Sequence, residues 1–192
     1  MKKWCVVLLV LVFNIANAQV IKVNSLFLTA QRFIENKPDF ESESRDKQQI
    51  KLKVRASKSL LDIQANGQVK QQSLTDFVAY KLSNGNTFRL VNGQSMKVLE
   101  SKGITLYAVT VSKKDNSFGK GNIYTNEVQY LFSVGIDSEP IVLNIYNLKK
   151  AFPNLIKFHE ALDTHFDTNA SLLKFDNYSG MYMLNLVFKQ AQ

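Results

Sequence analysis

The chain has 192 residues, of which 45% are hydrophobic and 21% are charged, and its formal net charge is +8. This composition is typical of a globular protein and argues against an intrinsically disordered chain. The basic residues are scattered, and no run of arginines interleaved with aromatic residues occurs. We therefore exclude nucleic-acid binding as the main role.

Residues 1–18 have the pattern of a secretory signal peptide. Two lysines precede an apolar run over 5–13, and residues 16–18 read Ala-Asn-Ala before Gln19. This pattern predicts cleavage after Ala18. The apolar run is too short to span a membrane, which takes roughly 20 residues, so we expect no integral membrane segment after cleavage. The expected location is the periplasm, the outer surface or the extracellular medium.

Cys5 is the only cysteine in the sequence and lies within this expected signal peptide. The mature chain then has no disulfide, no thiolate nucleophile and no cysteine ligand for a metal. Residues 19–192 are long enough for one domain with a sizeable core, and we expect a single domain.

The first elements after residue 18 are a strand over 20–28 and a short helix over 30–35. Thr29 is a suitable N-cap for this helix, Asn36 ends it and Pro38 prevents its continuation. Residues 39–47 follow as a charged loop. Its acidic residues lack the spacing of a calcium-binding loop, and we interpret them as solvated: Asp39, Glu41, Glu43 and Asp46.

Strands are predicted over 49–55 and 59–63, followed by a turn at Asn66-Gly67. Residues 76–111 then read as four antiparallel strands with turns at 83–86, Asn92-Gly93 and Lys102-Gly103. An Asn-Gly pair favours a type I′ turn, which needs positive φ at both residues. Alternation in the second of these strands places Phe88 and Leu90 on one face, with Arg89 and Val91 on the other.

A polar turn over 113–121 and a strand over 122–134 follow. Gly119 and Gly121 lie in that turn, but without a following helix or a G-K-[ST] motif they are a poor phosphate site. Asp137 and Glu139 belong to a loop before a short strand over 141–143.

The period of the apolar residues changes after residue 144. Asn144 or Asn147 can cap a helix through 152, and residues 155–166 form an amphipathic helix. A short helix over 169–175 follows, and we expect residues 180–188 to be an apolar strand inside the sheet. The predicted fold is α+β: an antiparallel sheet, largely a meander of seven or eight strands, covered on one face by the C-terminal helices.

His159 and Asp163 are the candidate catalytic residues. They lie four residues apart on one face of the helix over 155–166. A general base oriented by a carboxylate is one interpretation. A histidine at the edge of the core, held by a hydrogen bond to Asp163 or to backbone, is the interpretation we favour. A zinc site would need a third ligand, and His165 points away.

No other catalytic motif is complete. The sequence lacks G-x-S-x-G, and the S-x-x-K matches at Ser44 and Ser171 have no S-D-N or K-T-G partner motif. Asp137 with Glu139 is a weak carboxylate pair for glycoside hydrolysis. We expect no cofactor and no metal.

Four segments carry a resemblance to known proteins. They read SLFLTAQRFIENKP, GNTFRLVNGQSMKVLESKGITLYAV, YLFS and NLKKAFPNLIKFHEALDTHF. Together they resemble a group of exported bacterial proteins without an assigned function. The resemblance implies a small envelope or secreted domain, and it implies no catalytic residues.

Three functions remain open at this point. The sequence favours a non-catalytic secreted or cell-envelope protein that binds a protein partner or a surface component. The alternative is a hydrolase that uses His159 and Asp163. A purely structural subunit is the third.

Overall fold

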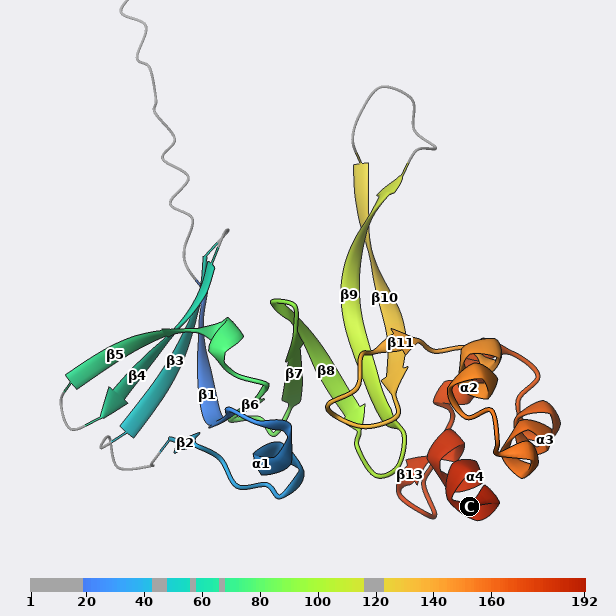
Figure 1. Cartoon of the computed structure of the whole chain (residues 1–192). Helices are drawn as coiled ribbons and strands as arrows, with labels where there is room; N and C mark the ends of the chain where they lie inside the picture. Colours follow the sequence, from blue (N-terminus) through green and yellow to red (C-terminus); the bar gives the residue numbers. More distant parts are fainter. Residues whose placement is uncertain (1–18, 43–47, 56–57, 66–67, 116–122) are drawn as a thin grey trace, which may run out of the picture.

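The structure is a computed structural model, and it describes residues 19–42, 48–55, 58–65, 68–115 and 123–192. A twisted antiparallel sheet runs through most of this part of the chain, and helices gather at one end of it (Figure 1). This arrangement confirms the predicted α+β fold. The expected signal peptide, 1–18, lies outside the described residues.

Eleven strands of the described chain form one sheet. Their spatial order is β11-β10-β9-β8-β7-β6-β1-β3-β4-β5, and β2 pairs with β1 beside this path. The strands are β1 (Gln19–Phe27), β2 (Phe40–Glu41), β3 (Gln48–Arg55), β4 (Lys58–Ala65), β5 (Gln68–Ser73), β6 (Ala79–Leu82), β7 (Thr87–Val91), β8 (Gln94–Glu100), β9 (Thr105–Asp115), β10 (Ile123–Ser133) and β11 (Ile141–Val142).

The expected number of seven or eight strands was too low. One strand without an apolar pattern is β5, a mostly polar sequence that pairs with β4 along its whole length. A second is the two-residue β2, which lies within the loop predicted over 39–47. Both are held by backbone pairing rather than by an apolar face, so alternation of side chains does not mark them.

The hairpin turns of the meander are confirmed. Asn92 and Gly93 join β7 to β8 with φ of 51° and 77°, the positive values that a type I′ turn requires. Gly103, in the turn from β8 to β9, has φ of 105°, and a Cβ there would lie 3.2 Å from the Asn185 side-chain oxygen. Glycine therefore lets the C-terminal region approach this turn closely. The predicted turn at Asn66-Gly67 lies outside the described residues.

The C-terminal helices are α2 (Ile145–Ala151), α3 (Ile156–His165), the 3-10 helix η2 (Asn169–Leu173) and α4 (Met183–Ala191). Asn144 caps α2, and its side chain accepts from the Asn147 backbone N–H over 2.7 Å. These helices cover one face of β9 and β10. Their common core includes Leu106 and Phe132 from the sheet. Helix residues that share this core are Leu148, Phe158, Leu162, Phe166, Leu172, Leu184, Val187 and Phe188.

The predicted strand over 180–188 is wrong. Only Met181 and Tyr182 are extended, as β13, which pairs with β12 (Phe175–Asp176) in a separate two-stranded sheet. Residues 183–191 form α4, because Leu184, Val187 and Phe188 share one helical face at spacings of three and four. Phe188 packs on Phe158 of α3 with ring centroids 5.2 Å apart.

Both faces of the middle strands are covered. On the face opposite α2 to α4, residues of β8, β9 and β10 pack with Phe33 of the short helix α1 (Ala30–Ile34). The strands β1, β3, β4, β6 and β7 enclose a further core that includes Leu74 of the 3-10 helix η1 (Leu74–Asp76). The face under α1 is therefore interior. The buried polar side chains of Arg89 and Ser133 lie on this face.

None of the helices in the described ranges is long and apolar enough to cross a membrane.

Candidate functional site

His159 and Asp163 do not contact one another through a hydrogen bond in the described structure. His159 Nε2 lies 2.9 Å from the backbone oxygen of Phe152, at the end of α2. Asp163 is exposed, and both its carboxylate oxygens accept from Lys149 Nζ, at 2.6 and 2.7 Å. The two side chains thus tie α3 to α2 at separate points. This geometry matches the favoured interpretation, a histidine at the core edge held by backbone.

The remaining candidates from the sequence occupy structural or exposed positions. Ser171 donates to the Thr168 backbone oxygen over 2.6 Å within the first turn of η2. Asp137 and Glu139 are exposed in the loop between β10 and β11. Glu43, Asp46, Ser44, Gly119 and Gly121 lie outside the described residues.

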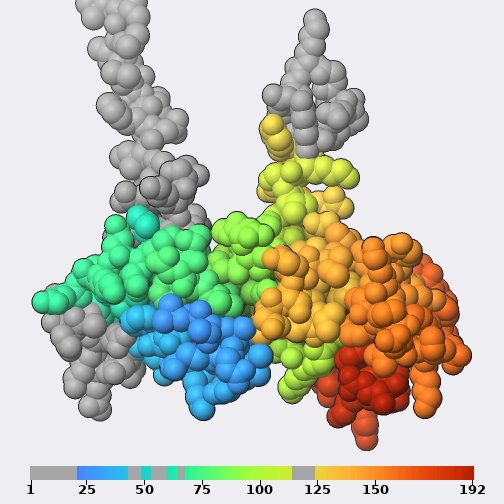
Figure 2. All heavy atoms as spheres, in the orientation of Figure 1, coloured from blue at the N-terminus to red at the C-terminus, as the bar shows by residue number. Residues whose placement is uncertain are grey.

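A pocket of about 410 Å³ lies on the α1 face of the sheet. Its walls come from α1 and the residues just after it, from the ends of the middle strands, and from the loop that follows β10. Figure 2 shows the surface of the α1 region, in blue, against the yellow-orange segment that includes this loop. The lining residues are Phe27, Phe33, Ile34, Asn36, Lys81, Thr87, Ser101, Gly103, Thr105, Gly135 and Ile136.

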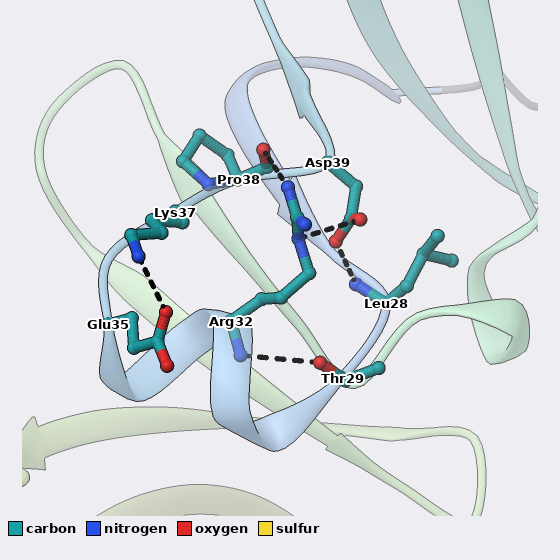
Figure 3. A network of polar contacts seen from close by, with 7 residues as sticks. All are labelled: Leu28, Thr29, Arg32, Glu35, Lys37, Pro38 and Asp39. Carbon is teal, nitrogen blue, oxygen red and sulfur yellow. Dashed lines mark hydrogen bonds and ion pairs between the residues drawn. The ribbon is translucent and has the colours of Figure 1, made fainter.

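A polar network holds α1 in place over the sheet (Figure 3). Thr29 caps the helix by accepting from the Arg32 backbone N–H over 3.2 Å, as its position in the sequence predicted. Asp39 accepts from Arg32 Nε and from the Leu28 backbone N–H, each over 2.8 Å. The carboxylate of Asp39 therefore joins the two ends of the α1 segment and fixes the helical wall of the pocket.

The residues after α1 complete this wall. Arg32 Nη2 also donates to the Pro38 backbone oxygen over 3.2 Å. Asn36 has φ of 52°, in the left-handed region that asparagine tolerates, and this ends the helix as predicted. Glu35 forms an ion pair with Lys37. The hydrogen bond from Gln31 and then the one from Lys37 lower the pKa of Glu35, so its carboxylate is ionised and engaged.

Beside the pocket lies a buried arginine. Arg89 is only 5% exposed and lies two residues after Thr87 in β7, on the same side of the sheet. Its Nη1 donates to the Tyr107 hydroxyl over 2.9 Å and to the Ser138 backbone oxygen over 2.8 Å, with a longer contact of 3.4 Å to Ser133 Oγ. The guanidinium also lies over the Tyr107 ring, 5.6 Å from its centroid.

Tyr107 and Ser133 link this arginine to the loop after β10. Their hydroxyls are 2.8 Å apart, and Ser133 donates to the Gly135 backbone oxygen over 2.6 Å. Both residues are fully buried. Tyr107 lies two residues after Thr105 in β9, and Thr105 lines the pocket. Ser133 ends β10 two residues before Gly135, which also lines the pocket. The buried cluster and the pocket therefore adjoin.

The charge of Arg89 meets no opposite charge among the described residues. No carboxylate of the described residues lies within ion-pair distance, and its acceptors are all neutral. Its Nε is buried and has no hydrogen-bond partner. Guanidinium stays protonated in proteins, and a buried charge without a partner is costly. An unsatisfied buried donor next to a pocket suits an anionic ligand group.

Sequence reasoning missed this arrangement. Alternation correctly separated Arg89 and Val91 from Phe88 and Leu90, but it indicated only that the face of Arg89 and Val91 is mixed in polarity. The available signal was a single arginine within the apolar stretch FRLV. The burial of this arginine can be inferred only when α1 and the loop after β10 are known to cover the same face of the sheet.

Within the described ranges, no three histidine, cysteine, aspartate or glutamate side chains gather as a metal site. No protein-family model, no curated protein and no solved structure matches this chain. The resemblance to exported bacterial proteins therefore stays a prediction.

Proposed function

We propose that this chain is an exported, non-catalytic binding protein, and that the pocket beside α1 takes up a component of the cell envelope or a chemical group of a partner. The observation that carries the proposal is the pocket of about 410 Å³, a size common among small-molecule sites. Its lining combines apolar side chains such as Phe27, Phe33 and Ile136 with a few polar ones. This mixture is also typical of ligand sites.

The construction of the pocket supports the same proposal. Its helical wall is held by a cap, an ion pair and hydrogen bonds to backbone, so its shape is set before a ligand arrives. A preorganised site loses less conformational entropy on binding. Export is proposed on separate grounds, the signal-peptide pattern of residues 1–18.

Binding can be tested with the protein expressed from its full chain. A screen of envelope-derived compounds by thermal shift should find ligands that raise the melting temperature. Ser101 lines the pocket and is exposed, so Ser101→Trp should block it without removing core contacts. Thr110 is exposed on β9 and does not line the pocket, and Thr110→Trp is the matched control.

The proposal expects ligands whose thermal shift is lost in Ser101→Trp and kept in Thr110→Trp. Ligands that act equally on both variants would place binding elsewhere and contradict it.

Export is tested by cell fractionation with N-terminal mass spectrometry. A chain that starts at Gln19 outside the cytoplasm is expected, and a chain that retains Met1 in the cytoplasm would refute export.

A further inference from the structure

We infer that the ligand of this pocket is an amphipathic carboxylate, whose carboxylate is bound by Lys81 and Arg89 and whose apolar chain packs along the α1 side. This inference rests on the proposed function, since it names the ligand class of the same pocket. Four observations support it: two cations that form no ion pair with a described residue, the ion pairs that already hold Asp39 and Glu35, the apolar part of the pocket lining, and a suitable volume.

Of the two cations, Lys81 lines the pocket, and Arg89 lies beside the pocket, outside its lining. Lys81 of β6 lines the pocket, is half-buried, and pairs in register with Thr87 of β7. Arg89 follows Thr87 by two residues on the same face, a separation of roughly 7 Å along a strand. Neither cation forms an ion pair with a described residue. An anion in the pocket near Thr87 would supply the charge that both lack.

Acidic side chains near the pocket do not fill this role. Asp39 is held by Arg32, and Glu35 by Lys37. Asp137 lies at the rim, because a Cβ on Gly135 would be 2.8 Å from its Oδ1, but it is exposed and forms no ion pair within the described chain. The protein thus offers more positive than negative charge to a bound group.

Carboxylate suits the donors that are present. A guanidinium Nε and a lysine ammonium are donors only, and a charged acceptor makes a stronger hydrogen bond to them than a neutral one. The hydroxyls of Thr87 and Thr105 are the next polar groups on the sheet side. These few groups can hold one carboxylate, and they leave the rest of the pocket for apolar atoms.

The apolar wall comes from α1, β1 and the loop after β10. Phe27 and Phe33 meet edge to face with ring centroids 5.3 Å apart, which fixes both rings. Ile34 and Ile136 add aliphatic surface to the lining. A purely inorganic anion would leave this surface in contact with water, whereas an alkyl chain would bury it, and the burial of apolar surface favours binding.

Calorimetric titration with octanoate, 1-octanol and acetate tests each part of the inference. Octanoate should bind the full-length protein, and 1-octanol should bind at least about tenfold more weakly because it lacks the charge. Acetate should bind at least about tenfold more weakly because it lacks the chain.

Lys81→Met should weaken octanoate binding about tenfold. Lys97→Met is the control, since Lys97 is exposed on β8 outside the pocket.

Arg89→Met is the second variant and should weaken octanoate binding by at least as much, provided that its circular dichroism is unchanged. If Arg89→Met fails to fold, the Lys81→Met result and the three-ligand comparison still decide. Equal affinity for 1-octanol and octanoate, lost in Ser101→Trp, would overturn the carboxylate inference and leave the pocket function standing. No octanoate binding would overturn the inference, whereas the compound screen decides the proposed function independently.

Discussion

The Nη1 atom of Arg89 donates a hydrogen bond to the hydroxyl of Tyr107 over 2.9 Å. The two residues belong to β7 and β9, which are separated in the sheet by β8. Arg89 therefore reaches across a strand, under the layer formed by α1 and the loop after β10. Hydrogen bonds to Tyr107, Ser133 and Ser138 connect three parts of the chain at the edge of the pocket.

Tyr107→Phe should destabilise the fold by about 1–3 kcal/mol, because it removes a hydroxyl that bonds two buried groups, Arg89 and Ser133. Urea unfolding followed by circular dichroism measures this change. Tyr146→Phe is the control, since Tyr146 is 74% exposed. If both variants unfold at the wild-type urea concentration, the buried network contributes nothing measurable to stability.

Asn185→Ala should be among the more damaging substitutions in α4. Asn185 is 1% exposed. Its side-chain oxygen accepts from the Ile104 backbone N–H, and its side-chain nitrogen donates to the Ile104 carbonyl oxygen, each over 2.9 Å. It also donates to Glu100 over 2.7 Å. The alanine variant leaves buried backbone groups without partners, at a cost of about 2–4 kcal/mol.

Chemical denaturation of Asn185→Ala beside Gln190→Ala measures this effect. Gln190 is an exposed residue of the same helix, and its substitution should change the unfolding free energy by less than about 0.5 kcal/mol. Similar changes in the two variants would show that the pairing of Asn185 with Ile104 does not decide how firmly α4 is held.

Asp39→Ala should loosen α1. The substitution removes the ion pair with Arg32 and leaves the Leu28 N–H without its acceptor, at a cost of about 1–2 kcal/mol. Amide hydrogen exchange at Leu28 and in residues 30–34 should accelerate, while exchange in α3 should not. Glu35→Gln, which alters an exposed pair, is the control. Unchanged exchange in Asp39→Ala would mean that apolar packing alone holds α1.

Alkaline pH should destabilise the protein in part through Tyr80. Burial raises the pKa of Tyr80 above its ordinary value of 10.0, against a smaller lowering by a hydrogen bond with Ser95. The unfolded chain then releases this proton at lower pH than the folded chain. The contribution to stability is fully present below pH 10 and is lost as the pH rises from there through the folded pKa.

The wild-type melting temperature should therefore fall more steeply above pH 10 than that of Tyr80→Phe. The phenylalanine variant keeps the stack on Phe88, whose ring lies 5.0 Å away and nearly parallel. Parallel pH profiles for the two proteins would show that other groups cause the alkaline loss.

The local signals of the sequence predicted the elements that local chemistry determines. The Asn92-Gly93 turn, the Thr29 and Asn144 caps and the apolar stripe of α3 depend on neighbours within a few residues, and the structure confirms them. The helix α4 was mistaken for a strand because residues 180–188 are apolar almost throughout. Leu184, Val187 and Phe188 fit a helical face only when α3 and β9 are known to lie beside them.

The candidate site depended on long-range contacts and was not predictable in the same way. Arg89 and Ser138 are 49 residues apart, and Asn185 and Ile104 are 81 apart. Neither pair leaves a periodic pattern. His159 and Asp163, the pair that spacing alone suggested, instead bind Phe152 and Lys149 of the neighbouring segment. A shared helix face brings residues near one another without making them partners.

The isoleucine methyl groups offer the most direct measurement of the central claim, that the pocket under α1 binds an amphipathic carboxylate. Ile34 and Ile136 line the pocket, and Ile156 is exposed on α3 outside it. In methyl NMR spectra of the isotopically labelled protein, octanoate should shift Ile34 and Ile136 in a saturable manner and leave Ile156 in place. Shifts confined to Ile156 and its surroundings, or none at saturating octanoate, would contradict the account.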